Sequence, residues 1–252
     1  MDEREDREPT GRKARAVHSS ERALEGLTRQ AYAGIRQMLF LDEIAPGQKL
    51  RYREIAERLG MSPTPVVQAM KWLEFQGLVE HEPNRGFYLS SVRPEEIREI
   101  YELRESIEVA CLPRAVERLD EEGIERLRAA LENHQQATRD RHLKRRLLAD
   151  IEYHMTLTGL AGGDIRVRMV GNLFDLLYLK YRGELLFSRL MEDVADEHRQ
   201  IFDHVVARDA EAAQKALSEH LRRIRDHVLE GLRRSAEERE ALGTGFSVFG
   251  SR

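Results

Sequence analysis

Four side chains in the second half of the chain have the types and spacing of a metal-binding site. Asp150 and His154 are four residues apart, so a helix would place both on one face. His198 and His220 lie 11 residues before and 11 residues after Asp209, where two predicted helices join. In an antiparallel helix pair, equal distances from the turn bring two residues to the same level. The sequence therefore predicts that one carboxylate and three imidazoles lie close together.

Three imidazoles and one carboxylate form a ligand set that suits Zn, Ni, Fe(II), Co or Mn. Such a set leaves coordination positions open for water or an organic ligand. The alternative is that these histidines are hydrogen-bonded core residues, since most buried histidines on helices bind no metal. The remaining histidines that we considered have no carboxylate at useful spacing or no matched level across the turn, and we expect them to be surface or core residues: His134, His142, His204 and His227.

Arg104, in the segment YELRESIEVAC, is a candidate for ligand binding. Its guanidinium could face a cavity in the helical domain, where a fork of N–H donors binds a carboxylate through two hydrogen bonds. Glu108 follows four residues later and allows a simpler interpretation. The two would then form a surface ion pair worth roughly 0.3 kcal/mol. The sequence leaves both interpretations open.

The elements that must position these residues follow from the apolar pattern. Between Pro94 and Arg234, Leu and Ile recur every three or four residues, which predicts a bundle of about six helices. Breaks are expected near residues 120–123, 139–145, 159–164 and 208–210. The predicted fold class is therefore mainly α.

The first part of the chain predicts a winged helix-turn-helix. One helix starts at Glu21, and a short second helix, RYREIAERL, ends at Gly60. A third helix begins at Ser62, and its predicted inward face consists of Val66, Ala69, Met70 and Leu73. Two β-prone pieces, 78–81 and 87–90, flank the turn EPNRG and predict a hairpin. Helix, helix, turn, helix and hairpin is the order of a winged helix.

Length and composition limit the class of protein. The 252 residues suit two domains better than one. The formal net charge is -4, so any DNA binding must depend on local charge. The single cysteine excludes an intrachain disulfide and suits a cytoplasmic location. We find no signal peptide and no apolar run long enough to span a membrane.

We expect four segments along the chain. Residues 1–20 form a disordered tail, and residues 21–92 form the winged helix-turn-helix domain. Residues 93–239 form the all-helical domain that binds ligand and metal, and residues 240–252 form a flexible tail.

The whole pattern resembles the FadR-like branch of the GntR family of bacterial transcription regulators. PGQKL, EIAERLGMS, TPV, LEFQGLV and NRGFYL follow the order of that family's winged helix. The helical part, from about Pro94 to Arg234, resembles the family's FadR C-terminal (FCD) effector domain. The resemblance implies a cytoplasmic homodimer that binds double-stranded operator DNA, acts as a repressor and is not an enzyme.

The resemblance also implies roles for the residues of the helical domain. Asp150, His154, His198 and His220 match the family's ligands for a divalent metal, with Zn or Ni first and Fe, Co or Mn as alternatives. Arg104 matches the arginine that meets the carboxylate of a small organic-acid effector. Two interpretations compete, a metal-dependent enzyme and a regulator whose metal is purely structural. We find no HExxH or GxSxG motif, which disfavours the enzyme.

The reading helix departs from the family pattern, because Pro63 and Val67 stand where the family places arginines. Ser62 is expected to cap the helix, and a proline at the first helical position needs no N–H partner. With no arginine left to bind guanine, we expect a half-site rich in A·T pairs, with Val67 on thymine and Gln68 on adenine. The predicted DNA-binding residues are Arg53, Ser62, Thr64, Val67, Gln68, Lys71, Arg85 and Gly86.

Overall fold

A computed structural model describes residues 10–45, 47–91, 93–180 and 191–245. The chain divides into two compact units, one reaching to Ser90 and the other beginning at Ser91, whereas the sequence placed the boundary after residue 92. Within the described ranges, none of the helices is long and apolar enough to cross a membrane.

Three helices form the body of the first unit: α1 (Thr10–Phe40), α2 (Tyr52–Arg58) and α3 (Pro63–Phe75). Gly60 has a positive φ of 65°, so the chain can turn sharply between α2 and α3. Helix α3 packs on α1, where Ala31 and Ile35 are buried. The predicted inward face of α3 is fully buried: Val66, Ala69, Met70 and Leu73. These apolar contacts determine which side of α3 is exposed.

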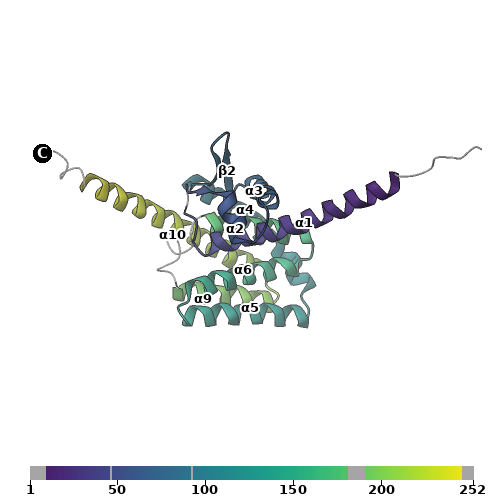
Figure 1. The fold of residues 1–252 in the computed structure, drawn as a ribbon. Coiled ribbons are helices and arrows are strands. Elements are labelled where there is room, and N and C mark those ends of the chain that lie inside the picture. The colour runs from purple at the N-terminus through teal and green to yellow at the C-terminus, as the bar shows by residue number, and fades with distance from the viewer. Residues whose placement is uncertain (1–9, 46, 92, 181–190, 246–252) are drawn as a thin grey trace, which may run out of the picture. The chain divides into compact units, whose positions relative to one another are not determined.

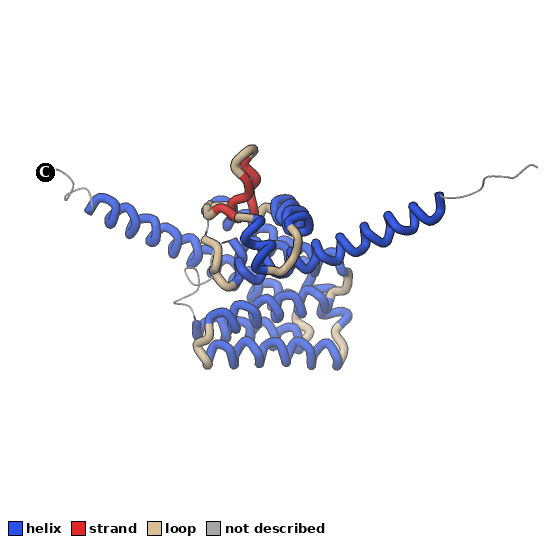
Figure 2. Tube along the Cα trace, viewed as in Figure 1, coloured by secondary structure: helices blue, strands red, loops and turns tan. Residues whose placement is uncertain are grey.

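A small antiparallel sheet completes the first unit (Figure 2). Strands β2 (Val79–Glu82) and β3 (Gly86–Leu89) form the predicted hairpin, and Asn84 takes a φ of 63° in its turn. Strand β1 (Lys49–Leu50) pairs with β3 and gives the order β1-β3-β2. The sequence did not predict β1, since two residues are too few to show an alternating pattern.

Both predicted tails are partly helical. Helix α1 begins at Thr10, so the prediction of a disordered tail is wrong for residues 10–20. Arg, Lys, Ala and Glu in this stretch are good helix formers, and their mixed charges do not oppose a helix. The last helix likewise continues to Gly245, so residues 240–245 are not a loose tail. Residues 1–9 and 246–252 lie outside the described part.

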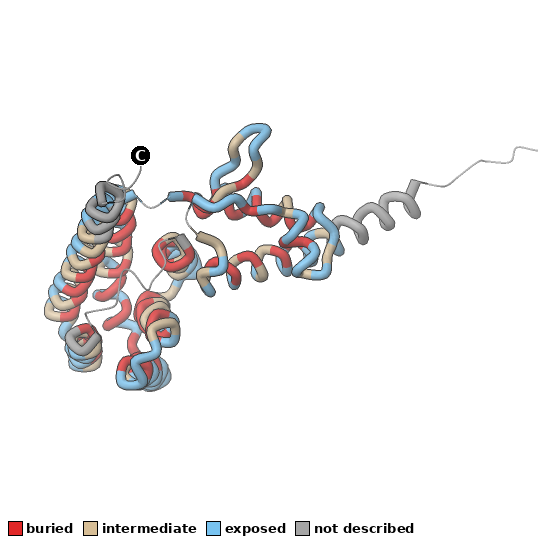
Figure 3. Tube along the Cα trace, turned by 60° about the vertical axis from the view of Figure 1, so that its left-hand side comes forward, coloured by how far each residue is buried: buried red, intermediate tan, exposed pale blue. Residues whose placement is uncertain are grey.

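The second unit is a helical bundle. Its described ranges contain six α-helices, α4 (Pro94–Arg118), α5 (Glu121–Arg139), α6 (Leu143–Leu160), α7 (Asp164–Asp175), α9 (Met191–Val206) and α10 (Ala210–Gly245). A π-helical turn, η1 (Leu176–Lys180), follows α7 directly. Helices α5 and α9 lie side by side (Figure 1). Buried residues follow the sides of the helices that face one another (Figure 3). The mainly α prediction is confirmed. The four predicted breaks separate α4 from α5, α5 from α6, α6 from α7 and α9 from α10, whereas the end of α7 at Asp175 was not predicted.

Arg208 ties the turn between α9 and α10 to the end of α4. Its guanidinium donates to the carbonyl oxygens of Val116, at 2.8 Å, and of Leu119, at 2.7 Å. Carbonyls at a helix end lack partners within the helix, so the cationic side chain supplies what α4 needs there. The link holds three helices in register, and two of them carry the histidines predicted to bind metal.

We expect Arg208→Ala to lower the free energy of unfolding by about 1–2 kcal/mol, because two charge-assisted hydrogen bonds are lost. Arg208 has a φ of 58°, and alanine keeps the Cβ, so the backbone strain is unchanged. Arg141→Ala is the matched control, since Arg141 is exposed and has a φ of 52°. Urea unfolding followed by circular dichroism measures both. Equal stabilities of the two variants would contradict the role given to Arg208.

Candidate metal centre

The four predicted metal ligands gather inside the helical unit. Asp150 and His154 lie on α6, His198 on α9 and His220 on α10, and one potential ligand atom of each lies within 4.8 Å of all the others. The Nε2 atoms of His198 and His154 are 3.5 Å and 3.9 Å from Asp150 Oδ1. The ring centres of His198 and His220 are 4.7 Å apart, so the two histidines face each other across the helix pair.

The outward nitrogens of the three histidines are held by neighbouring side chains. His154 Nδ1 lies 2.6 Å from Glu108 Oε2, and His220 Nδ1 lies 2.8 Å from a carboxylate oxygen of Glu197. His198 Nδ1 lies 3.4 Å from Nδ1 of His134. Partners of this kind fix the ring orientation and direct Nε2 toward a common centre.

The inward nitrogens are the unusual feature. Nε2 of His154 and Nε2 of His198 are buried, and neither has a hydrogen-bond partner among the described residues. Buried polar atoms in folded proteins are nearly always paired, so an unpaired atom requires an explanation. A metal ion bound by these nitrogens supplies one, which an ordinary packed histidine does not. The donor set thus fits a divalent cation.

The protonation states also suit a metal. Burial lowers the pKa of His198 well below its usual value, and neighbouring imidazoles lower it further. Burial lowers the pKa of His220 as well, although its hydrogen bond to Glu197 opposes the shift. Burial raises the pKa of Asp150, but the surrounding His154 and His134 outweigh it and bring the pKa to about 2. Neutral imidazoles and an ionised carboxylate are the forms that bind metal.

Arg104 and Glu108 form a buried ion pair rather than a surface pair. Their side chains are 2% and 1% exposed, and Arg104 Nε donates to Glu108 Oε1 at 2.7 Å. The other oxygen of Glu108 contacts His154, so one carboxylate joins the arginine to a predicted metal ligand. Burial raises the pKa of Glu108, but Arg104 and His154 outweigh it and lower the pKa to about 2. The interpretation of Arg104 as half of a surface pair is therefore wrong.

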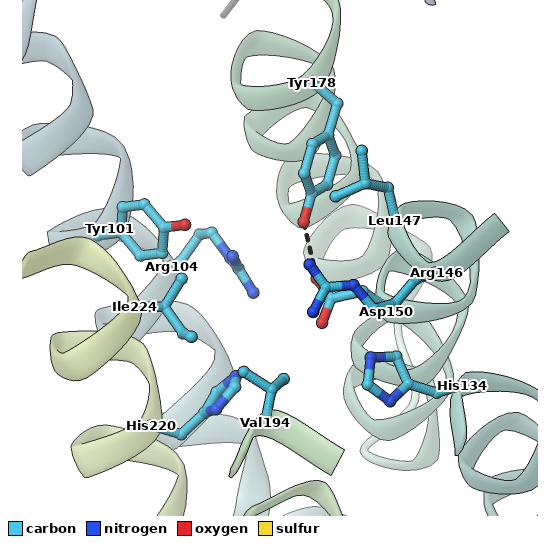
Figure 4. Close-up of a pocket in the computed structure, with 10 residues that line it drawn as sticks. All are labelled: Tyr101, Arg104, His134, Arg146, Leu147, Asp150, Tyr178, Val194, His220 and Ile224. Carbon is cyan, nitrogen blue, oxygen red and sulfur yellow. Dashed lines mark hydrogen bonds between the residues drawn. The ribbon is translucent and has the colours of Figure 1, made fainter. Parts of the chain in front are cut away.

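A small cavity adjoins the cluster (Figure 4). Its volume is about 20 Å³, enough for one water molecule or an ion. The hydroxyl of Tyr178, on η1, donates to Asp150 Oδ2 at 2.7 Å. The Arg104 guanidinium lies 3.9 Å from the ring centre of Phe174, and its Nη2 has no hydrogen-bond partner within the described part. The cavity is lined by Tyr101, Arg104, His134, Arg146, Leu147, Asp150, Tyr178, Val194, His220 and Ile224.

Sequence reasoning missed several residues of this centre. Glu108 is 46 residues from His154, Tyr178 is 28 residues from Asp150, and His134 is 64 residues from His198. Periodicity relates residues on one helix or across one turn and cannot identify partners this far apart. The general need of a metal-bound histidine for a second partner could have predicted that carboxylates would be present, but not which ones.

The start of α3 differs in part from expectation. Ser62 occupies the N-cap position with extended backbone (φ −69°, ψ 157°), but its side chain makes no capping hydrogen bond. Thr64 and Lys71 are exposed, as a DNA-facing surface requires, and Val67 is half-buried.

Gln68 turns toward α1. Its Oε1 lies 3.1 Å from Thr28 Oγ1, which is also 2.8 Å from the carbonyl oxygen of Leu24. One hydroxyl proton cannot serve both oxygens, so the reversed amide, donating from nitrogen to Thr28, satisfies all three groups. In either orientation the Gln68 amide contacts Thr28, and its contact with adenine stays a prediction.

The other predicted DNA contacts lie on α2 and the hairpin. Arg53 is exposed on α2, and Arg85 is exposed beside Glu82, with 3.1 Å between Arg85 Nη1 and Glu82 Oε2. Gly86 has a φ of 105°, which L-residues rarely adopt. Lys49 on β1 is an exposed cation next to Gly86 that the sequence analysis missed.

Two family models match the chain. The model described as "Bacterial regulatory proteins, gntR family" matches residues 27–89, and the model "FCD domain" matches residues 99–223. Each match falls within one of the two units of the structure.

Curated relatives cover most of the chain. An HTH-type transcriptional regulator in an unstable DNA locus of Streptomyces ambofaciens is 31% identical over 208 residues, 79% of this chain and 84% of the relative. The HTH-type transcriptional repressor RspR of Escherichia coli (strain K12) is 26% identical over 205 residues, 80% of this chain and 89% of RspR.

Solved structures share the fold. A GntR transcriptional regulator from Rhodococcus sp. RHA1 superposes with a TM-score of 0.70 at 22% identity, covering 81% of this chain and 97% of that one. McbR/YncC of E. coli gives a TM-score of 0.68 at 22% identity, covering 78% and 94%.

We expect Glu108→Ala to lower the free energy of unfolding by about 3–5 kcal/mol, since it leaves Arg104 charged, buried and unpaired. Glu102→Ala, at an exposed position of the same helix, is the control and should change stability by less than about 0.5 kcal/mol. Chemical denaturation of the two variants beside the parent protein provides the comparison. A Glu108 variant as stable as the control would show that the buried pair contributes nothing.

Proposed function

The chain belongs to the GntR family of bacterial regulatory proteins, and on that basis we propose that it is a homodimeric transcriptional repressor controlled by a small organic acid. GntR regulators bind DNA, and FCD domains bind effectors. One relative, RspR, is named a transcriptional repressor, which supports repression here as well. The acid is proposed to bind beside a divalent metal in the helical unit.

The unpaired Nε2 atoms of His154 and His198 carry the metal part of the proposal. These two atoms, His220 and the carboxylate of Asp150 would hold the ion, with Zn or Ni as the first candidates and Fe, Co or Mn as alternatives. Four ligands would close a tetrahedral zinc site, whereas an octahedral ion such as Ni, Fe, Co or Mn would keep two positions open beyond these four. The bound ion would offer a positive charge to an anionic ligand.

Arg104 is proposed to bind the effector's carboxylate. It lines the cavity, and its Nη2 is buried without a partner in the described part of the chain, so one donor is available. The cavity of about 20 Å³ is smaller than any multi-carbon acid, so an acid that enters must enlarge it. Movement of the lining helices would then accompany binding. A ligand shifts a regulator only through its different affinities for two arrangements, and this mismatch in size creates such a difference.

The DNA-binding surface is proposed to comprise the exposed part of α3 together with α2 and the hairpin. In a dimer, two α3 helices would enter successive major grooves about 34–36 Å apart. Thr64 and Lys71 would contact phosphates, and Val67 would contact a thymine methyl group. Helix α3 contains no arginine, so the half-site should depend on A·T pairs. Arg53, Arg85 and Lys49 supply further positive charge.

We expect purified protein to contain about one divalent ion per chain, and His154→Ala or His220→Ala to lose most of it because each removes a ligand. His204→Ala is the control, since His204 lies on α9 outside the cluster. Elemental analysis after dialysis without chelator measures the content. Parent protein that takes up none of the five candidate metals would refute the metal site.

We expect Lys71→Ala to weaken binding to specific and scrambled DNA alike and to reduce the slope of log K against log[salt] by about 0.9, the value for one lost phosphate contact. The operator half-site for this measurement comes from selection on random DNA. Lys215→Ala, an exposed lysine on α10, should leave the slope unchanged. A selected half-site built on essential guanines would contradict the proposed dependence on A·T pairs.

A further inference from the structure

A buried hydroxyl at the cavity has no role in the function proposed above. Tyr101, on α4, is 2% exposed, and its hydroxyl has no hydrogen-bond partner among the described residues. Tyr101 lines the same cavity as Arg104, whose Nη2 also lacks a partner in that part of the chain. Buried hydroxyls in folded proteins are nearly always paired, so an unpaired one at a cavity indicates an acceptor that a bound molecule supplies.

The two unpaired donors reach the cavity from the same helix. Tyr101 and Arg104 are three residues apart on α4, so their side chains are neighbours on one face of that helix. The guanidinium carbon of Arg104 lies 5.4 Å from the centre of the Tyr101 ring. In Figure 4 the ends of both side chains point toward the side of the cavity where Asp150 lies. A single anionic group placed there can accept from both.

The Tyr101 hydroxyl is a neutral donor at physiological pH. Burial raises the pKa of Tyr101 well above its usual value, and the nearby charge of Arg104 opposes the shift only in part. The carboxylate of the protein that lines the cavity, Asp150, accepts from Tyr178. A ligand carboxylate has two acceptor oxygens and no proton to donate, which matches one neutral donor beside one cationic donor.

We propose that Tyr101 is a second recognition residue for the acid effector, with its hydroxyl donating to one carboxylate oxygen while Arg104 Nη2 donates to the other. This inference rests on the proposed function, because it concerns the same acid. The proposed ligands of the metal lie on α6, α9 and α10, whereas both donors lie on α4. The Tyr101 hydroxyl can therefore be removed without removing a ligand of the ion.

Calorimetric titration of the nickel-loaded full-length protein tests this assignment. The probes are formate, acetate, propionate and butyrate, and the acid that the parent protein binds most tightly is then used for the variants. Tyr101→Phe should bind that acid about 10- to 100-fold less tightly, the range expected for one hydrogen bond to a charged group. Its nickel content should equal that of the parent protein.

Thermal unfolding separates recognition from a structural role. Tyr101→Phe keeps the ring beside Arg104 and removes only an unpaired oxygen, so the acid-free variant should unfold at the same temperature as the parent or at a higher one. Tyr153→Phe is the matched control, since the Tyr153 hydroxyl is also buried but donates to the carbonyl oxygen of His198 at 2.8 Å. It should unfold at a lower temperature and keep most of its affinity for the acid, because Tyr153 does not line the cavity.

The outcomes distinguish this inference from the function it rests on. Parent and Tyr101→Phe proteins that bind the acid equally tightly overturn the role of Tyr101 and leave the metal and Arg104 proposals standing. A Tyr101→Phe variant that unfolds at a clearly lower temperature than the parent also overturns that role, because the hydroxyl then supports the fold. Parent protein that holds nickel but binds none of the four acids overturns the proposed acid effector and this inference together.

Discussion

The carboxylate of Glu108 is the interaction on which the helical unit depends. A buried arginine and a buried imidazole each need a partner, and this one side chain bonds both Arg104 and His154. The Arg104–Glu108 pair lies within α4, whereas the Glu108–His154 contact joins α4 to α6 and forms only if these helices pack at the correct distance and rotation. The apolar core of the bundle therefore has to align a polar contact between two helices as well as exclude water. Without that alignment, His154 would lose a buried hydrogen-bond partner, which is unfavourable.

The other histidines of the cluster are also held by buried polar partners. Each histidine of the cluster is fixed on its outer side by Glu108, His134 or Glu197, which leaves the inner side for a ligand. The polar residues thus form two layers inside an otherwise apolar bundle, an inner layer of histidines and an outer layer of their hydrogen-bond partners. Helices far apart in the chain contribute to every layer, so the centre exists only in the folded protein. Any ion or molecule bound there would contact several helices at once.

Local geometry explains what the sequence could predict. The levels of His198 and His220 follow from counting residues on either side of one turn, and the buried face of α3 follows from helical periodicity. Residue pairs that meet only through tertiary packing could not be predicted from the sequence. The pairing of Glu108 with His154 is one example, and the turn of Gln68 toward Thr28 is another. Strand β1 was missed because its two residues pair with β3 through backbone atoms, whatever their side chains.

The size of the cavity has a consequence for the speed of the response. A space of about 20 Å³ admits a water molecule, so the acid proposed as effector would bind only after the bundle had opened. The rate of association would then be set by the frequency of opening rather than by diffusional encounter, and the apparent affinity would be reduced by the small open fraction. Release would require the same opening. A regulator of this kind would average over brief fluctuations in the concentration of its acid and respond only to sustained changes.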